Sequence, residues 1–414
     1  MRPRLHFTAD SGWINDPHGI TYRDGRYHLF YQYAPDSLVW SPHCHWGHAV
    51  SPDLLRFDRL PVAISPGDGD DGIWTGSMAH DEGSGTIFYT SVRTPALGIG
   101  RVRSATPDDP DWRAWTKGPV VVEAPPQLDL VAFRDPFVLH DGTRWRMLVG
   151  AALADGVAAA LSYSSPDLVS WTYDGIAASR SSAERDPVWT GALWECPQLF
   201  ELDGRHVLVT SVWFDNVLHY AAYAVGRYAD GVFAADTWGQ LSYGPSYYAP
   251  SLFRDEAGRP SLTFWLRGVE DGAAGWTGAH SVPHTLTLDG DRLVATPHAR
   301  LAGYRSDQVP SGHVDGLAAD ATWSPESGSV LHCHSGGVEL FQLRLGPTGL
   351  VLDQGQESWA MPYDGGPVRL VVDGPVVEVS ARLGLLALPL EPLGPDLDLT
   401  AESGALTVWP LDAP

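Results

Sequence analysis

Hydrophobic and polar residues alternate along this chain in short stretches that recur at a regular distance. Residues 20–31, ITYRDGRYHLFY, form two such stretches around Asp24-Gly25, a pattern that predicts a β-hairpin with a tight turn. Similar units begin at Met78, Phe137, Leu199 and Leu252, and their turn aspartates lie 57, 60, 62 and 52 residues apart. These turn aspartates are Asp24, Asp81, Asp141, Asp203 and Asp255. The spacing indicates an internal repeat.

Each unit carries further strand-like sequence after its hairpin, so that one repeat holds about four short strands. A Ser-Pro-Asp-Leu phrase follows twice, at residues 51–54 and 165–168, with Phe57 and Trp171 at matching positions after it. A period of this size with about four strands per unit is typical of a β-propeller. Hairpin repeats also occur in sandwiches, which do not usually keep so regular a spacing. We therefore predict a five-bladed β-propeller over residues 1–305.

The period ends near residues 309–312, which read VPSG. Strand-like alternation returns over residues 330–345, 367–380 and 405–411, separated by glycine and proline turns and without a helical pattern. This predicts a second, small domain over residues 312–414, most simply a β-sandwich. The chain as a whole is therefore expected to be all-β.

The net charge and the cysteine content limit which partners the protein can bind and in which cellular compartment we expect it. The formal net charge of −23 argues against nucleic acid or an anionic membrane as a partner, whereas a neutral small molecule would be unaffected. No apolar run of signal-peptide or membrane-helix length is present, and the three cysteines, far apart and odd in number, imply no disulfide framework. We expect a cytoplasmic protein. Export without a leader and the oligomeric state stay open.

Three carboxylates fall at nearly the same register of the repeat. Asp16 lies 8 residues before its turn aspartate, Asp135 lies 6 before, and Glu195 lies 8 before. A proline follows each acid within two residues and helps to fix the backbone. An aspartate before proline is most often a turn residue, but three acids at one register of a propeller would meet at its axis. Crowded carboxylates with divergent pKa values are the equipment of glycoside hydrolysis.

Aromatic residues accompany these acids. The same register gives Trp74-Thr75 in the second unit and Tyr247-Tyr248 in the fifth. We expect Trp74, Thr75 and Tyr248 to border a sugar site, where aromatic faces stack on the C–H surfaces of the ring. Further candidates are Trp40, Trp46 and Trp194. Any one of these rings, taken alone, is more often a core residue than a ligand contact, because aromatic side chains dominate core packing.

Three motifs resemble those of glycoside hydrolase family 32, the family of invertases, inulinases and levanases. WINDPHG at residues 13–19 resembles the family's nucleophile motif, FRDP at 133–136 its Arg-Asp-Pro motif, and WECP at 194–197 its Glu-Cys-Pro motif. Weaker likenesses extend along nearly the whole chain, at residues 30–33, 46–49, 74–77, 243–250 and 371–379. His18, the pair Trp74-Thr75, and Ser242 depart from the residues common in the family. The preference for substrate length is left open by these departures.

The resemblance implies a retaining, exo-acting β-fructofuranosidase of the five-bladed propeller fold. Asp16 would be the nucleophile, Glu195 the general acid/base, and Asp135 the residue that stabilises the transition state. Substrate contacts are expected from Asn15, Gln32, Trp40, Trp46, Trp74, Thr75, Arg134, Trp194 and Tyr248. The expected substrates are sucrose and short fructo-oligosaccharides, and neither cofactor nor metal is expected.

Other functions fit parts of the same pattern. The scaffold could serve a fructosyltransferase or a fructan exohydrolase, an inverting arabinan- or xylan-cleaving glycosidase, or a sugar-binding propeller without catalysis. His43, Cys44, His45 and His48 resemble a cluster of metal ligands but lack a recognised ligand spacing. Cys196 beside the acid could suggest a thiol nucleophile. Without an evident histidine partner, we interpret it as a packing residue.

Overall fold

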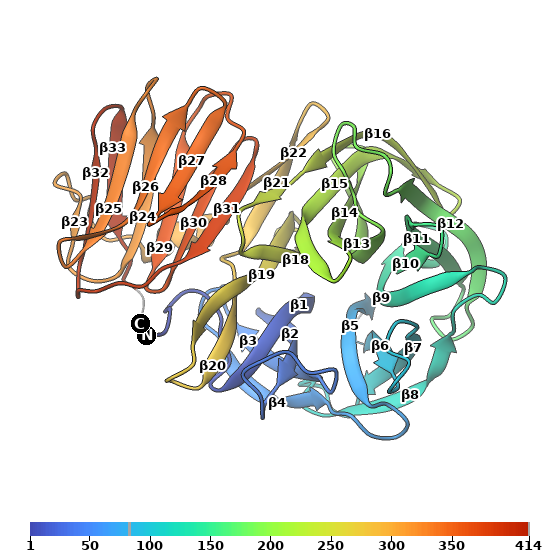
Figure 1. Cartoon of the computed structure of the whole chain (residues 1–414). Coiled ribbons are helices and arrows are strands. Elements are labelled where there is room, and N and C mark those ends of the chain that lie inside the picture. Colours follow the sequence, from blue (N-terminus) through green and yellow to red (C-terminus); the bar gives the residue numbers. More distant parts are fainter. Residues whose placement is uncertain (82–83, 413–414) are drawn as a thin grey trace.

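The computed structural model describes residues 1–81 and 84–412. Strands make up nearly all of the regular structure in this part of the chain, and the helical element described there is the short 3₁₀ helix η1 (Ala299–Tyr304). The predicted all-β class is therefore confirmed. Two groups of sheets lie side by side in Figure 1, a ring of sheets from the first three quarters of the chain and a flatter stack from the last quarter.

Within the described residues, the ring contains three separate four-stranded antiparallel sheets, each built from strands consecutive in sequence. The first is β5 (Gly72–Asp81), β6 (Ser84–Val92), β7 (Arg101–Pro107) and β8 (Trp115–Val122). The second is β9 (Leu130–His140), β10 (Trp145–Leu153), β11 (Val157–Ser165) and β12 (Thr172–Ser181). The third is β13 (Leu193–Leu202), β14 (Arg205–Phe214), β15 (Val217–Ala229) and β16 (Val232–Gln240). Each begins with a predicted hairpin; the turn residues 82–83 of the hairpin around Asp81 lie outside the described part.

The first and last repeat units share one nine-stranded sheet. The first supplies β1 (Gly12–Arg23), β2 (Arg26–Ala34), β3 (His45–Ser51) and β4 (Asp58–Ile64). The last supplies β18 (Tyr247–Arg254), β19 (Pro260–Asp271), β20 (Trp276–His280), β21 (His284–Asp289) and β22 (Arg292–Pro297). Parallel pairing of Gly12 and Trp13 with Trp276 and Thr277 joins the two units. The division into five blades is thus an interpretation of the repeat rather than a count of separate sheets.

The first strand of every unit lies toward a common centre. Figure 1 shows β1, β5, β9, β13 and β18 around the middle of the ring, with β4, β8, β12 and β16 at its outside. Neighbouring members of the inner set contact one another. Residues at equivalent positions on these strands are therefore brought close together, as the register of the three acids requires.

The last quarter of the chain forms two six-stranded sheets that share one hydrophobic core, which includes Trp323, Phe341 and Leu370. One sheet has the order β17 (Ser242–Tyr243), β31 (Gly384–Pro389), β30 (Val376–Ala381), β29 (Val368–Asp373), β24 (Ala318–Ser324) and β33 (Ala405–Pro410). The other has the order β23 (His313–Val314), β32 (Leu397–Ala401), β25 (Val330–Ser335), β26 (Val338–Gly346), β27 (Gly349–Gln354) and β28 (Glu357–Met361). Strand β17 comes from the chain between the fourth and fifth units, so the two groups of sheets are joined by a parallel strand pair as well as by the backbone.

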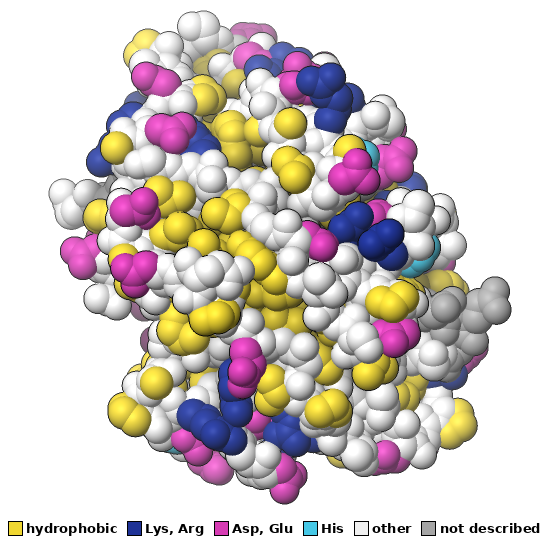
Figure 2. All heavy atoms as spheres, turned by 90° about the vertical axis from the view of Figure 1, so that its right-hand side faces the viewer, with side chains coloured by type: hydrophobic (Ala, Val, Ile, Leu, Met, Phe, Trp, Pro, Cys, Tyr) yellow, Lys and Arg dark blue, Asp and Glu magenta, His cyan; other side chains and the backbone are white. Residues whose placement is uncertain are grey.

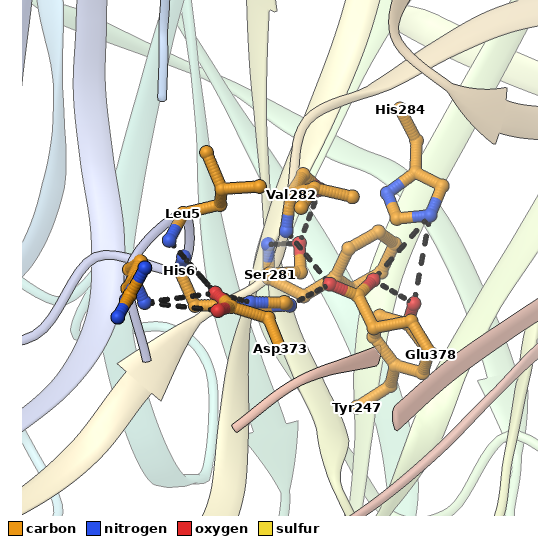
Figure 3. A network of polar contacts seen from close by, with 10 residues as sticks. Leu5, His6, Tyr247, Ser281, Val282, His284, Asp373 and Glu378 are labelled. Carbon is orange, nitrogen blue, oxygen red and sulfur yellow. Dashed lines mark hydrogen bonds and ion pairs between the residues drawn. The ribbon is translucent and has the colours of Figure 1, made fainter. Parts of the chain in front are cut away.

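A buried polar network also joins the two groups (Figure 3). His6, from the segment before β1, lies between two carboxylates of the last sheets, with Nδ1 2.9 Å from Asp373 Oδ2 and Nε2 2.5 Å from Glu378 Oε1. Glu378 also accepts hydrogen bonds from the Tyr247 hydroxyl and from the Val282 backbone N–H. Burial by itself would lower the pKa of His6, but hydrogen bonds to Asp373 and Glu378 outweigh it and raise that pKa to about 9. A protonated His6 therefore holds two buried carboxylates together.

Charged side chains of both signs are mixed over the surface in view in Figure 2, where hydrophobic side chains run across the middle of the face. This face has no continuous basic surface of the kind that binds nucleic acid, in line with the net charge of −23. Among the described residues, no helix has the length and apolar character needed to cross a membrane.

Candidate active site

The pairing of the inner strands is interrupted at the same place in all five repeat units. The breaks fall between Ile14 and Pro17 of β1, between Arg134 and Phe137 of β9, and between Glu195 and Gln198 of β13. Strands β5 and β18 have the same irregularity after Trp74 and after Tyr248. Proline cannot donate to a strand ladder, and β-bulges turn side chains out of the sheet's alternation. The acid motifs are thus local kinks that aim carboxylates into the centre of the ring.

These kinks border a cavity of about 760 Å³. Asp16, Asp135 and Glu195, from three different inner strands, all line it. Residues that follow the acids, such as Pro17, Pro136 and Gln198, enclose only a space of about 10 Å³ behind them. The inner strands therefore run from the open side of the cavity toward a closed base, and the acids lie where the open part ends.

Neutral groups hold the Asp16 carboxylate. Asn15 Nδ2 donates to its Oδ1 over 3.0 Å, while Thr75 Oγ1 and Gln32 Nε2 donate to its Oδ2 over 2.5 and 3.2 Å. Gln32 also donates to Thr75 Oγ1, so the three residues form one network. Burial, together with the charge of Glu195, raises the pKa of Asp16 to about 6, although the hydrogen bonds from Thr75 and Asn15 act against the rise.

Asp135 is held by hydrogen bonds from backbone N–H groups, and its side chain is almost fully buried. Its Oδ2 accepts from the backbone N–H of Cys196 over 3.0 Å, and its own N–H donates to Thr90 Oγ1 over 2.7 Å. Its backbone has φ of 65°, a conformation rare for residues other than glycine, which the surrounding hydrogen bonds maintain. Burial and the charges of Glu195 and Asp16 raise the pKa of Asp135, and the nearby Arg134 only partly offsets that rise.

Glu195 has a different environment from the two aspartates. Arg134 donates to its Oε1 through Nε and Nη2, over 3.1 and 2.9 Å, and the Tyr248 hydroxyl donates to its Oε2 over 2.7 Å. The Glu195 side chain keeps 16% of its surface exposed to the cavity. Two carboxylates held by uncharged donors and one held by a cation and a phenol are thus collected around one space.

Cys196 packs between the two aspartates. Its Sγ lies 3.8 Å from Asp16 Oδ2 and 3.8 Å from Asp135 Oδ2, and burial together with the carboxylate charges raises the pKa of the thiol well above its ordinary value. A thiol in this environment stays protonated and is a poor nucleophile. The interpretation of Cys196 as a packing residue is consistent with its position.

The predicted aromatic residues separate into two groups. Trp40, Trp74 and Tyr248 line the cavity, with the rings of Trp40 and Trp74 in edge contact at 5.7 Å. Trp46 and Trp194 are fully buried and do not line it. Trp46 donates to the backbone carbonyl of Trp74, and Trp194 packs on Trp238 of the same sheet. Their expected contact with substrate is not supported by these positions, because each ring faces a core.

Several cavity residues were not predicted from the sequence. Trp13, Trp213 and Trp265 line the cavity, as do Leu97, Val131, Leu193, Asn216 and Leu218. Among the described residues, nothing hydrogen-bonds the buried indole nitrogen of Trp265. Trp213 lies near the end of β14, and Trp265 lies within β19 opposite Tyr248. Both are on second strands of predicted hairpins, and an antiparallel second strand returns to the open side of the first, which is the signal that could have found them.

The residues weighed as metal ligands are not brought together. His43 Nδ1 contacts the carbonyl of Asp71, Cys44 donates to the carbonyl of Ser41, and His48 contacts His28. In the described part of the chain, a group with the proximity of metal ligands is found instead at His313, Asp396 and Asp398, in the second group of sheets. Among the described residues, Asp16, Asp135 and Glu195 at the centre of the ring do not lie close enough together to form a group of this kind.

The chain is similar to known glycoside hydrolases. The family model for the Glycosyl hydrolases family 32 N-terminal domain matches residues 6–297. A sucrose-6-phosphate hydrolase from Zymomonas mobilis is 32% identical over 317 residues, 71% of this chain and 61% of that protein. A β-fructofuranosidase, insoluble isoenzyme 4, from Oryza sativa subsp. japonica is 35% identical over 74% of this chain and 57% of its own length. The match thus spans about 60% of the length of these curated relatives.

Solved structures share the fold over the whole chain. A family 32 β-fructofuranosidase from Bombyx mori superposes with a TM-score of 0.85 at 23% identity, covering 99% of this chain and 94% of that one. A fructan 1-exohydrolase IIa from Cichorium intybus superposes with a TM-score of 0.79 at 22% identity, covering 99% and 97%. At this level of identity, the likeness concerns the fold.

Proposed function

Since the chain belongs to glycosyl hydrolases family 32, we propose that it is a retaining, exo-acting β-fructofuranosidase. The observation that carries the proposal is the meeting of Asp16, Asp135 and Glu195 around one cavity that is closed behind them. We assign residues 1–305 to a five-bladed propeller that holds the site and residues 312–414 to a β-sandwich.

In the proposed reaction, Asp16 attacks the anomeric C2 of a terminal fructose while Glu195 gives its proton to the leaving oxygen. Water then gives a proton to Glu195 and displaces Asp16, which releases fructose with its configuration retained. Asp135 and the guanidinium of Arg134 would hold ring hydroxyls, and the carboxylate of Asp135 would stabilise the positive charge that develops at C2.

The closed base supports attack at chain ends. A fructose seated against the acids has about 10 Å³ of space behind it, too little for a further sugar residue. Only the terminal unit of an oligosaccharide could then enter, with the remainder extending toward the open side. We therefore propose exo cleavage of sucrose and short fructo-oligosaccharides, with fructose as the first small product.

The cavity favours unphosphorylated sugars. Its lining holds three carboxylates, and the lining residue with a positive charge, Arg134, already binds Glu195. A phosphate would bring two further negative charges without a free cation to meet them. Although several relatives are named sucrose-6-phosphate hydrolases, we propose sucrose as the better substrate here.

Product analysis tests the activity. The purified protein should release glucose and fructose from sucrose, and fructose alone at early times from inulin, with a lower kcat/KM for sucrose 6-phosphate than for sucrose. Early oligosaccharides without fructose would contradict exo cleavage. An equal or higher kcat/KM for the phosphorylated sugar would contradict the charge argument.

A trapping experiment tests retention. The Glu195→Gln variant has no base to activate water, so with p-nitrophenyl β-fructofuranoside it should accumulate a fructosyl group on Asp16. Mass spectrometry of the peptide that contains Asp16 should show a gain of one fructosyl unit. Turnover without a covalent adduct, or an adduct on another residue, would favour the inverting alternative or another nucleophile.

A further inference from the structure

Arg267 of β19 lies against the phenol ring that holds Glu195. Its Cζ is 5.0 Å from the centre of the Tyr248 ring, so that the cation faces the aromatic ring. The hydroxyl of the same ring donates to Glu195 Oε2 over 2.7 Å. Arg267 is not among the described residues that line the cavity. Any effect of Arg267 on the reaction must therefore pass through its neighbours.

The guanidinium is held by backbone carbonyls from two parts of the chain. Nη1 donates to the carbonyl of Leu218 over 2.6 Å, Nη2 to that of His219 over 3.2 Å, and Nε to that of Ser246 over 3.4 Å. Strand β15 pairs with β16 only from Ala222 onward, so the first two carbonyls lie beyond the reach of β16. At this end of β15, the donors come from a side chain of the fifth unit instead of a strand of the fourth.

The positive charge of Arg267 faces Tyr248 without a counter-ion. Among the described residues, no carboxylate forms an ion pair with Arg267. A guanidinium stays protonated, and a positive charge nearby makes a phenol more acidic and thus a stronger hydrogen-bond donor. Burial and the charge of Glu195 raise the pKa of Tyr248 well above its ordinary value, and Arg267 acts against this rise. Arg267 therefore strengthens the hydrogen bond from Tyr248 to Glu195.

The same guanidinium fixes the end of the hairpin formed by β14 and β15. The hairpin turns at Asp215 and Asn216, which both have positive φ, as a tight two-residue turn requires. Asn216 and Leu218 bring this end of the hairpin to the cavity. Strands β14 and β15 also contact β18, the strand of Tyr248. One side chain thus holds two walls of the cavity relative to each other.

We propose that Arg267 is a positioning residue, which holds the Tyr248 hydroxyl against Glu195 and strengthens its donation; this inference rests on the proposed function. The phenol fixes Oε2 of Glu195, while Arg134 holds Oε1. Glu195 must face the leaving oxygen to protonate it, and small displacements of a general acid cost much of its effect. Arg267 therefore supports the proton transfer without touching the substrate.

The first test compares two substrates that differ in their need for an acid. Arg267→Gln removes the charge and keeps a side-chain donor, whereas Arg267→Lys keeps the charge. In Arg267→Gln, kcat/KM for sucrose should fall by about tenfold. For p-nitrophenyl β-fructofuranoside the fall should be no more than about twofold, because p-nitrophenolate leaves with little help from an acid. Arg267→Lys should restore most of the activity on sucrose.

Loosening of the hairpin alone would affect both substrates, since both place their leaving group beside it. Equal losses of kcat/KM on sucrose and on p-nitrophenyl β-fructofuranoside would therefore overturn the inference. Equal behaviour of Arg267→Gln and Arg267→Lys would also overturn it, because the charge would then be irrelevant.

The pH profile gives a second measurement that a merely structural role would not change. At high pH, kcat/KM for sucrose falls as Glu195 loses the proton that the leaving oxygen needs. A nearby cation and a phenol donor both favour the ionised carboxylate, so Arg267→Gln should move this limb to higher pH by roughly half a pH unit. An unmoved limb, or one moved to lower pH, would contradict the proposal. The variant leaves the charged and titratable groups around Glu195 in place, which are Asp16, Asp135, Arg134, Cys196 and Tyr248.

A double-variant cycle tests whether Arg267 acts through Tyr248. Tyr248→Phe should by itself lower the ratio of kcat/KM for sucrose to that for p-nitrophenyl β-fructofuranoside. Adding Arg267→Gln should then change this ratio by less than about twofold. Arg254→Gln is the control, since Arg254 also donates to two backbone carbonyls but at the exposed end of β18, and both substrates should be unaffected. A full effect of Arg267→Gln in the Tyr248→Phe protein would overturn the assignment.

The unaltered protein separates this inference from the proposed function. If it cleaves neither sucrose nor p-nitrophenyl β-fructofuranoside, both fail. If it releases fructose from both and Arg267→Gln keeps the ratio of the two activities, the proposed function stands and the role of Arg267 fails.

Discussion

At the scale of the residue, Asp16 is held by side chains that carry no charge. Asn15, Gln32 and Thr75 donate to it, and none of them neutralises it as an arginine would. The Asp16 carboxylate carries its negative charge at pH values above its pKa of about 6, while Arg134 is directed to Glu195. The partners differ because Asn15, Gln32 and Thr75 lie on β1, β2 and β5, whereas Arg134 lies on β9.

Replacing Asp16 by asparagine should abolish the chemistry and preserve the fold. The side chains are nearly isosteric, but an amide does not attack C2, so kcat for sucrose should fall by roughly four orders of magnitude. Asp203→Asn is the control, since Asp203 lies in an exposed hairpin turn with φ of 51°, a conformation that asparagine tolerates. Near-normal turnover by the Asp16 variant, with an unchanged thermal unfolding curve, would exclude Asp16 as nucleophile.

Removing the Thr75 hydroxyl should move the acid limb of the pH profile. Asp16 must be ionised to attack, and its pKa of about 6 predicts that kcat/KM falls as the pH drops below 6. The hydrogen bond from Thr75 lowers that pKa, so Thr75→Val should raise it and shift the limb to higher pH. Thr75→Ser keeps the hydroxyl and should restore the original limb. An unmoved limb in Thr75→Val would mean that another group controls it.

At the scale of the element, one irregularity is repeated in all five inner strands. Each is interrupted at the level of the acids, and a proline occurs there in β1, β9, β13 and β18. A regular strand would present alternate residues to the centre, whereas a bulge re-aims the side chain beside it. The paired strands thus hold the acids rigidly, and the bulges turn the acid side chains toward the centre of the ring.

The segment before β1 is held by the buried contacts of His6 with Asp373 and Glu378. The contribution of these contacts to the free energy of unfolding should depend on pH. The pKa of His6, raised to about 9, lies above its ordinary value near 6.5, so protonated His6 stabilises the fold fully below about pH 6.5. This contribution, roughly 3 kcal/mol, should decline as the pH rises and be lost above about pH 9. Urea unfolding at pH 6 and pH 9 measures it.

The variant His6→Gln should lower the free energy of unfolding at pH 6 by about 3–5 kcal/mol, because Asp373 and Glu378 lose their buried partner. It should also flatten the dependence on pH between 6 and 9. His313→Gln is matched to it, since His313 lies between Asp315 and Asp398 but is exposed, and it should cost no more than about 1 kcal/mol. Equal losses in both variants would show that the burial of His6 does not matter.

At the scale of the whole molecule, the ring and the last two sheets are built as one body. Leu5, Val282 and Leu301 pack with Val371 and Leu411 in a single buried cluster. Strand β17 pairs with β31, and Glu378 reaches Tyr247, the residue before the Tyr248 that holds Glu195. The last sheets therefore support the strand that borders the active site.

This shared core predicts that the molecule unfolds in one cooperative transition. Heating should cause loss of sucrose hydrolysis and loss of the far-ultraviolet circular dichroism signal at the same temperature, with equal van't Hoff and calorimetric enthalpies. A chain ending at residue 305 should be insoluble, because it exposes Leu5, Val282 and Leu301. Two separate transitions, or a soluble and active truncated chain, would show that the two groups of sheets are independent.

Local chemistry within the sequence was enough to predict the elements and the acids. Alternation of period two around Asp24-Gly25 and its counterparts specifies hairpins, because side chains on a strand point to opposite faces and the turn needs few residue types. Asp16, Asp135 and Glu195 could be found because their register is counted along the chain, and the family motifs around them are continuous segments.

The tertiary structure alone decided which aromatic rings reach the cavity. Trp46 and Trp194 were predicted beside the sugar but are buried, while Trp13, Trp213 and Trp265 line the cavity. Bulges interrupt the alternation at the acids, and Trp213 and Trp265 reach the cavity from second strands, whose position depends on how the sheets pack. The contact of His6 with Asp373 and Glu378, more than 360 residues away, likewise leaves no trace in local pattern. Such contacts depend on how whole sheets pack. The local pattern of residues along the chain does not contain this information.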